Sequence, residues 1–216
     1  DNEDWTPEIF AVAIRTNLSK TDFSGADLSD ANLSGANITH ANFSKTKLSR
    51  ADITWALLNN SNFHKSTFEY SKCDYSDLSN TDFSKTNFRF ATLHSAKLVK
   101  ANFKDADLSE ADLYFSNLSN TILADAYLKN TKLQRICARK ANLRNANLTG
   151  ADLRGAIFHM ADLSRAILIG SDCSDTNFGG SYGIVPGDTD FSQANLSYVD
   201  FSSANLSGAN FSYANL

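Results

Sequence analysis

Residues 26–45 read Ala26-Asp27-Leu28-Ser29-Asp30, Ala31-Asn32-Leu33-Ser34-Gly35, Ala36-Asn37-Ile38-Thr39-His40, Ala41-Asn42-Phe43-Ser44-Lys45. A large apolar residue, which we call the centre of its unit, returns at every fifth position. A small residue lies two positions before each centre, and Asp or Asn usually lies between them. Of the 33 centres from Leu18 to Phe178, 30 are Leu, Phe or Ile, so one pattern governs most of the chain.

A period of five excludes the ordinary secondary structures. In an α-helix, five residues turn through about 500°, so the centres would drift around the helix. In a continuous strand, an odd period would send successive centres to opposite faces. Each unit must therefore bend: a short extended piece directs the centre and the small residue inward, and polar residues form a corner. Because five residues cannot bury an apolar side chain alone, we expect the units to wind into stacked coils.

The pattern resembles the pentapeptide-repeat family, whose units read Ala-(Asp/Asn)-Leu-x-x. The resemblance covers residues 16–216 apart from one interruption. It implies an all-β fold, a right-handed quadrilateral β-helix with four units, and hence twenty residues, per coil. We expect about ten coils and a rod about 45 Å long. Counting in twenties puts five rings on one inward ladder: Phe23, Phe43, Phe63, Phe83 and Phe103.

Two segments depart from the repeat. Residues 1–15 begin with an N-cap-like Thr6-Pro7-Glu8 followed by apolar residues, which predicts a short capping helix over the first coil, with a loose apolar arm as the alternative. After Phe178 the frame breaks and resumes at Phe191, which predicts a loop at 179–188 projecting from a corner.

The pattern continues to Leu216, so a last coil ending there would expose its strand edges and its centres. We expect either that the natural chain continues or that this end forms a homodimer.

Composition and charge limit the possible partners and compartments. A net charge of −4 does not predict general attraction to nucleic acids, and no apolar run predicts membrane insertion. In the geometry that the resemblance implies, the centres Cys73 and Cys173 lie five coils and about 24 Å apart, too far for a disulfide, and Cys137 faces outward. Free thiols favour a reducing compartment. We expect a cytoplasmic, bacterial protein by default, and the alternative of a removed N-terminal targeting segment stays open.

The sequence offers no catalytic or metal-binding constellation. Gly179-Gly180-Ser181-Tyr182-Gly183 matches G-x-S-x-G, but that motif requires a later His, and no His follows His159. His40, His64, His94 and His159 fall on different outward positions when the chain is folded in twenties. We therefore expect no enzyme activity, no catalytic residue, no metal and no cofactor.

Outward-facing aromatic residues are the clearest candidates for partner binding. Trp55, Tyr75 and Phe115 occupy equivalent outward positions, and Tyr114 lies beside them, so we expect all four on one edge of the rod. Tyr70 and Phe90 should line the preceding edge, and Tyr182 and Ile184 lie in the predicted loop. Nothing in the repeat requires these side chains, which favours a protein-binding surface. Incidental surface packing is the alternative.

Charge is unevenly distributed along the chain. Residues 1–128 carry a net charge of −5, residues 129–150 carry +6, and residues 151–216 carry −5. We interpret this middle part as a basic girdle that either is simply solvated or meets an anionic partner. Its members are Lys129, Lys132, Arg135, Arg139, Lys140 and Arg144.

The function that we expect is a rigid, non-enzymatic scaffold for protein–protein interaction. The resemblance implies an alternative, because some family members are DNA mimics that occupy DNA gyrase, a topoisomerase, and protect it from quinolones. The resemblance implies that these mimics are dimeric rods with strongly acidic faces. A net charge of only −4 and the basic girdle depart from that pattern.

Overall fold

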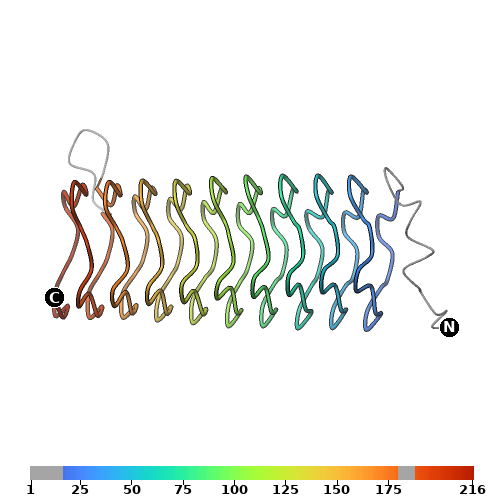
Figure 1. The fold of residues 1–216 in the computed structure, drawn as a ribbon, viewed down its shortest axis with the longest axis horizontal. Coiled ribbons are helices and arrows are strands. Elements are labelled where there is room, and N and C mark those ends of the chain that lie inside the picture. Colours follow the sequence, from blue (N-terminus) through green and yellow to red (C-terminus); the bar gives the residue numbers. More distant parts are fainter. Residues whose placement is uncertain (1–16, 180–187) are drawn as a thin grey trace.

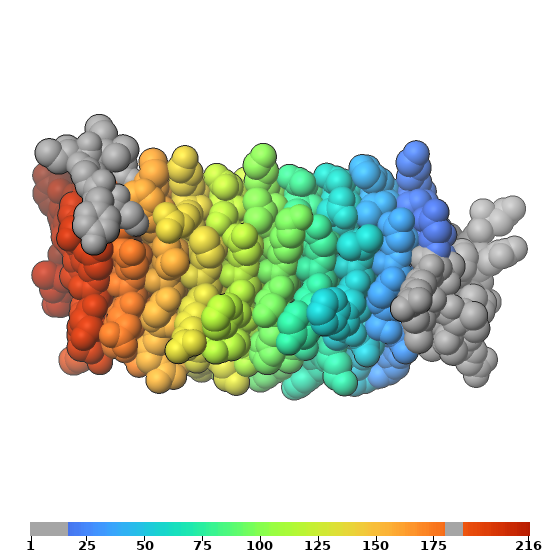
Figure 2. Space-filling view, turned by 90° about the horizontal axis from the view of Figure 1, so that it is seen from above, coloured from blue at the N-terminus to red at the C-terminus, as the bar shows by residue number. Residues whose placement is uncertain are grey.

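The computed structural model describes residues 17–179 and 188–216, which wind into coils stacked along one long axis (Figure 1). The first described coil and the C-terminal coil lie at opposite ends of the rod, and the coils pack without large gaps in the space-filling view (Figure 2). The described residues contain no α-helix. The capping helix predicted at 1–15 and most of the predicted loop, including Tyr182 and Ile184, lie outside the described residues.

Single-residue parallel bridges set the register between coils. Asn17 pairs with Asn37 and Asp22 pairs with Asn42, and the same offset of twenty continues along the rod. Twenty residues per coil, and therefore four five-residue units, is the period that the family resemblance implies. Across the interruption the offset becomes 28, as in the bridge from Asp162 to Asp190. Eight residues are therefore inserted without breaking the stack.

Hydrogen bonds satisfy all five amides of a unit, which explains why Asp or Asn recurs before each centre. Three of the amides bond to neighbouring coils, one closes the turn, and one is capped by the Asp or Asn side chain. In one unit the bonds are Asn42 N to Thr21 O (3.0 Å), Phe43 N to Asn62 O (2.6 Å), Ser44 N to Asn42 Oδ1 (3.2 Å), Lys45 N to His64 O (2.9 Å) and Thr46 N to Phe43 O (3.1 Å).

The centres and the small residues form the core, as the sequence predicts. The ladder that begins at Phe23 is stacked, with ring centroids 4.6, 4.6, 5.3 and 5.0 Å apart from one coil to the next. Each buried centre contributes about 1.5–3 kcal/mol of gross hydrophobic free energy. Cys73 and Cys173 are free and buried, and burial raises the pKa of both thiols to about 12.

Threonine can replace alanine in the small position because its hydroxyl finds a partner there. The hydroxyl of Thr46 donates to the carbonyl of Phe23 at 2.7 Å, and that of Thr86 donates to the carbonyl of Phe63 at 2.8 Å. Both carbonyls belong to centres in the preceding coil. These two buried hydroxyls therefore link coils, and both are hydrogen-bonded.

In the described coils, the residue two positions after a centre, which we call the corner residue, has a left-handed backbone. The φ angle of Lys65 is 61°, and corner residues from Lys20 to Asp175 all have positive φ. Type II turns require this conformation at their third residue and usually place glycine there. An L-residue with a side chain loses about 1–2 kcal/mol in it, and the hydrogen bonds between coils offset that cost.

Candidate functional site

Corner residues twenty positions apart form rows along the rod. One of these rows, which we call the Trp55 row, contains the three aromatic residues that the sequence assigns to one edge. Their side chains are exposed: 65% for Trp55, 50% for Tyr75 and 52% for Phe115. In order along the rod, the described residues of the row before the interruption are Gly35, Trp55, Tyr75, Ser95, Phe115, Arg135, Gly155 and Asp175.

The aromatic residues of the Trp55 row do not form one continuous stack. The rings of Trp55 and Tyr75 stack with centroids 4.4 Å apart and planes inclined by 8°. Ser95 occupies the next position, so Phe115 instead makes an edge contact with Tyr114 at 5.1 Å. The guanidinium carbon of Arg135 lies 5.9 Å from the centroid of the Phe115 ring. The row therefore contains two aromatic groups separated by one small residue.

The backbone of the Trp55 row makes its aromatic residues costly for the fold. Trp55, Tyr75 and Phe115 have φ angles of 61°, 60° and 62°, which are unusual for bulky residues. Gly35 has the same conformation in the same row, with a φ angle of 65° and no side chain to strain it. Stacking of one ring pair returns only about 0.5–1.5 kcal/mol. The fold alone gives no reason for three aromatic residues at these positions.

A second aromatic pair lies on the preceding corner of the rod. The rings of Tyr70 and Phe90 stack at 4.9 Å with planes inclined by 7°, and both are exposed. The guanidinium carbon of Arg89 lies 5.4 Å from the Phe90 centroid. Tyr70 and Phe90 therefore line the preceding corner, as the sequence predicts. Aromatic side chains are thus exposed on two neighbouring corners of the rod. Two other exposed corner residues, Tyr198 and Tyr213, were not predicted from the sequence.

Polar side chains beside the Trp55 row connect successive coils. The carboxylate of Asp74 accepts hydrogen bonds from the Thr92 hydroxyl at 3.0 Å and from the backbone amide of His94 at 2.8 Å. His94 Nε2 lies 3.0 Å from Asp112 Oδ1, and Asp112 Oδ2 lies 3.0 Å from Lys132 Nζ. This network was not predicted from the sequence, although the twenty-residue spacing of Asp112 and Lys132 indicates part of it.

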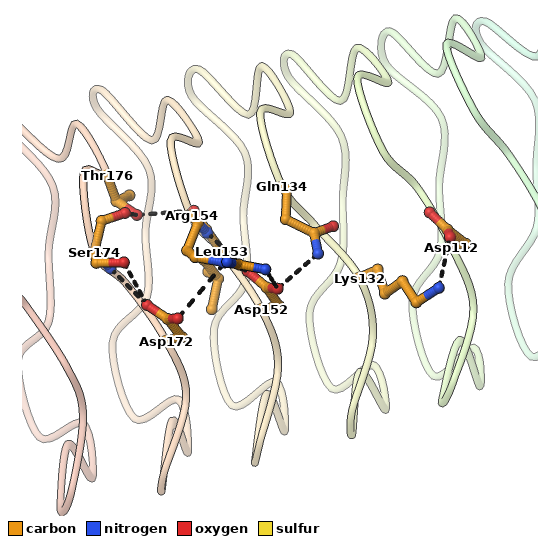
Figure 3. A network of polar contacts seen from close by, with 9 residues as sticks. All are labelled: Asp112, Lys132, Gln134, Asp152, Leu153, Arg154, Asp172, Ser174 and Thr176. Carbon is orange, nitrogen blue, oxygen red and sulfur yellow. Dashed lines mark hydrogen bonds and ion pairs between the residues drawn. The ribbon is translucent and has the colours of Figure 1, made fainter.

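The same face continues as alternating acids and donors toward the C-terminus (Figure 3). Asp152 accepts from Gln134 Nε2 and from Arg154 Nη2, both at 2.6 Å. Arg154 Nε also lies 3.6 Å from Asp172 Oδ2. Cationic or amide groups therefore accompany the acids on this face, unlike the strongly acidic faces that the DNA-mimic alternative requires.

The carboxyl group of Asp112 should make the stability of the fold depend on pH. Burial alone would raise the pKa of Asp112, but hydrogen bonds from His94 and Lys132 outweigh it and hold the pKa below its ordinary value of 3.8. This group therefore stabilises the fold above pH 3.8, and that contribution is lost as the pH falls through the lowered pKa. We expect Asp112→Asn to lose less stability than the wild type between pH 7 and about pH 3 in urea unfolding. Equal losses would contradict the assignment.

The basic girdle encircles the rod instead of forming a patch. Its six residues come from four consecutive units, and four units make one coil, so the charges lie on all four sides. Lys132 is paired with Asp112, and Arg135 lies over Phe115. Lys129, Arg139, Lys140 and Arg144 form no ion pair with any residue that the structure describes. A flat anionic partner could therefore meet only part of the girdle.

The remaining features that the sequence singled out are metal binding, membrane insertion, Cys137 and the last coil. Within residues 17–179 and 188–216, no three His, Cys, Asp or Glu side chains are grouped to hold a metal ion, and no helix could span a membrane. Cys137 is half-buried. In the last coil the centres Phe201, Leu206 and Phe211 are only partly buried, and Leu216 is 81% exposed. Homodimer formation through this end stays a prediction.

The family of pentapeptide repeats matches in eight copies over residues 11–44, 46–84, 86–123, 121–159, 146–182 and 187–216. The chain belongs to this family. Members fold as right-handed quadrilateral β-helices and are generally non-enzymatic repeat proteins, and the described coils agree with that fold. No curated protein sequence matches the chain.

Two solved structures illustrate the likeness. HetL, a pentapeptide repeat protein involved in heterocyst differentiation regulation from the cyanobacterium Nostoc sp. strain PCC 7120, is 30% identical with a TM-score of 0.83. The match covers 91% of this chain and 87% of HetL. A trypsin-treated form of QnrB1, a plasmid-mediated fluoroquinolone resistance protein, is 17% identical with a TM-score of 0.46, over 88% of this chain and 86% of QnrB1. That second likeness is too low to support an argument about function.

Proposed function

We propose that the protein is a rigid, non-catalytic scaffold that binds a protein partner through the Trp55 row. One observation carries the proposal: exposed aromatic side chains occupy left-handed corner positions where glycine would be less strained. Aromatic residues supply much of the binding energy at protein interfaces, because they bury a large area with few rotatable bonds. The stacked pair Tyr70–Phe90 on the preceding corner extends the same surface.

The rod suits this role because its backbone is held between coils at every unit. A surface that is already ordered loses little conformational entropy when it binds. HetL, the similar structure, is described as involved in regulation of heterocyst differentiation, and regulation requires recognition of another molecule. This likeness supports a binding role, and the site itself rests on the aromatic residues.

The proposal is tested by capture of partners on the immobilised protein from a lysate of the source organism. A triple variant, Trp55→Gly, Tyr75→Gly and Phe115→Gly, should lose at least about tenfold of the captured partner, because central aromatic residues each contribute about 2 kcal/mol or more. The matched control is Asn60→Gly, Asn80→Gly and Asn120→Gly, which changes polar corner residues with similar φ angles in another row. Equal capture by the two triple variants would contradict the proposal.

A further inference from the structure

One position of the Trp55 row, between two aromatic residues, has no aromatic side chain. Tyr75 and Phe115 are two coils apart, and the residue between them in the row is the exposed Ser95. Trp55 covers one face of Tyr75, and Arg135 lies one coil beyond Phe115 on the other side. The space over Ser95 between Tyr75 and Phe115, which we call the gap, therefore borders two aromatic side chains and only one small side chain. At about 4.8 Å per coil, their positions in the row are about 10 Å apart.

This spacing matches one planar group. The stacked pairs of this protein have centroid separations of 4.4 Å for Trp55–Tyr75 and 4.9 Å for Tyr70–Phe90. A planar group placed over Ser95 would therefore lie about one coil from the row positions of both Tyr75 and Phe115. We propose that this position receives the guanidinium group of an arginine from the protein partner, an inference that rests on the function proposed above.

The rod already places guanidinium groups against corner aromatics. Arg135 lies 5.9 Å from the centroid of Phe115, in the same row and one coil further along. Arg89 lies 5.4 Å from the centroid of Phe90 on the preceding corner. A guanidinium is planar, permanently charged and weakly hydrated, so it stacks on aromatic faces better than an ammonium group does. A partner arginine over Ser95 would repeat an arrangement that this chain makes twice.

Charge beside the gap also favours a cation. Asp74 directly precedes Tyr75, and its carboxylate accepts the amide of His94, the residue before Ser95. Within residues 17–179 and 188–216, no Lys, Arg or His side chain forms an ion pair with Asp74. Its other hydrogen-bond donor is the neutral Thr92 hydroxyl. An inserted arginine would gain this negative charge in addition to the two rings, whereas an inserted aromatic side chain would gain only the rings.

The test is an NMR titration of the full chain with three capped peptides, Gly-Arg-Gly, Gly-Lys-Gly and Gly-Phe-Gly. We expect Gly-Arg-Gly to shift the ring resonances of Tyr75 and Phe115 saturably and to bind roughly fivefold more tightly than either of the other peptides. Ser95→Tyr fills the vacant position and should abolish the shifts. The fold should accept it, because Tyr70 and Tyr75 already occupy such corners with φ angles of 59° and 60°.

Two further variants keep the result interpretable. Ser95→Ala leaves the gap open and should bind Gly-Arg-Gly as the wild type does, while Asp74→Asn should weaken binding roughly two- to fivefold. Equal binding of Gly-Phe-Gly, no saturable shift with any peptide, or unchanged binding by a folded Ser95→Tyr variant would each overturn the inference. If Ser95→Tyr also captures the partner as well as the wild type, while the triple glycine variant does not, the proposed function stands and the arginine assignment fails.

Discussion

Phe63→Asp is expected to unfold the coils on either side of residue 63. Phe63 is fully buried and its ring stacks on Phe43 at 4.6 Å and on Phe83 at 5.3 Å. Removing a buried phenylalanine costs about 3–5 kcal/mol. An aspartate at this depth adds several kcal/mol, because its carboxylate would be buried without a partner or would have to take up a proton.

The measurement is a thermal melt followed by circular dichroism. A repeat protein is stabilised mainly by contacts between neighbouring repeats, so the loss should appear as a lower melting temperature or as an early partial transition. Phe63→Leu is the matched control. Leucine already occupies the equivalent ladder positions Leu123 and Leu143, so its cost should be much smaller. A melt of Phe63→Asp that superimposes on the wild-type curve would refute the stacked core.

Lys65→Pro is expected to be strongly destabilising although Lys65 is exposed. The φ angle of Lys65 is 61°, and its amide donates to the carbonyl of Ser84 in the next coil at 3.0 Å. Proline fixes φ near −65° and has no amide hydrogen, so both the turn and the bond between coils would be lost. By analogy with proline inside a helix, the loss should be about 3 kcal/mol or more.

Lys65→Gly at the same position is the control, because it should not lower the stability of the fold. Glycine adopts positive φ without strain and keeps the amide donor, so stability should be unchanged or slightly higher. Urea unfolding of both variants measures the difference directly. If the proline variant is as stable as the glycine variant, the left-handed assignment of the corners is wrong.

Much of the fold could be predicted from the sequence because the period of five has only one simple structural solution. The inward positions of the centres and the ladder of rings from Phe23 are confirmed. The period of twenty came from the family resemblance, since five-residue units alone do not determine how many make a coil. The bridges join the residue before each centre to the residue twenty positions later, and they confirm this period up to the interruption.

The corner conformation could not be read from composition. Most corner residues of this chain are Lys, Asn, Asp or aromatic, and glycine, the usual signal for positive φ, is found at only a few, such as Gly25 and Gly35. The usual preference for glycine at positive φ is overridden because hydrogen bonds to the adjacent coils impose the turn regardless of the side chain. Ion pairs between coils, such as Arg50 with Asp30, follow the same spacing and could have been predicted from it.

The candidate site was predictable only as a set of equivalent positions. The sequence places Trp55 and Tyr75 side by side, and the structure stacks them. It does not show that their backbone is left-handed, that Phe115 turns to Tyr114, or that Asp74 bonds to the amide of His94. These features depend on side-chain directions that a repeat pattern does not specify. Binding by Tyr182 and Ile184 stays a prediction.

The central claim is that the aromatic residues of the Trp55 row serve binding and not folding. The melting temperature of the triple variant Trp55→Gly, Tyr75→Gly and Phe115→Gly tests it most directly. Relief of left-handed strain, about 1–2 kcal/mol per residue, should offset the lost stacking and the greater freedom of glycine in the unfolded chain. We predict a melting temperature within about 5 °C of the wild type. A decrease well beyond that would show that the row supports the fold and would contradict the account.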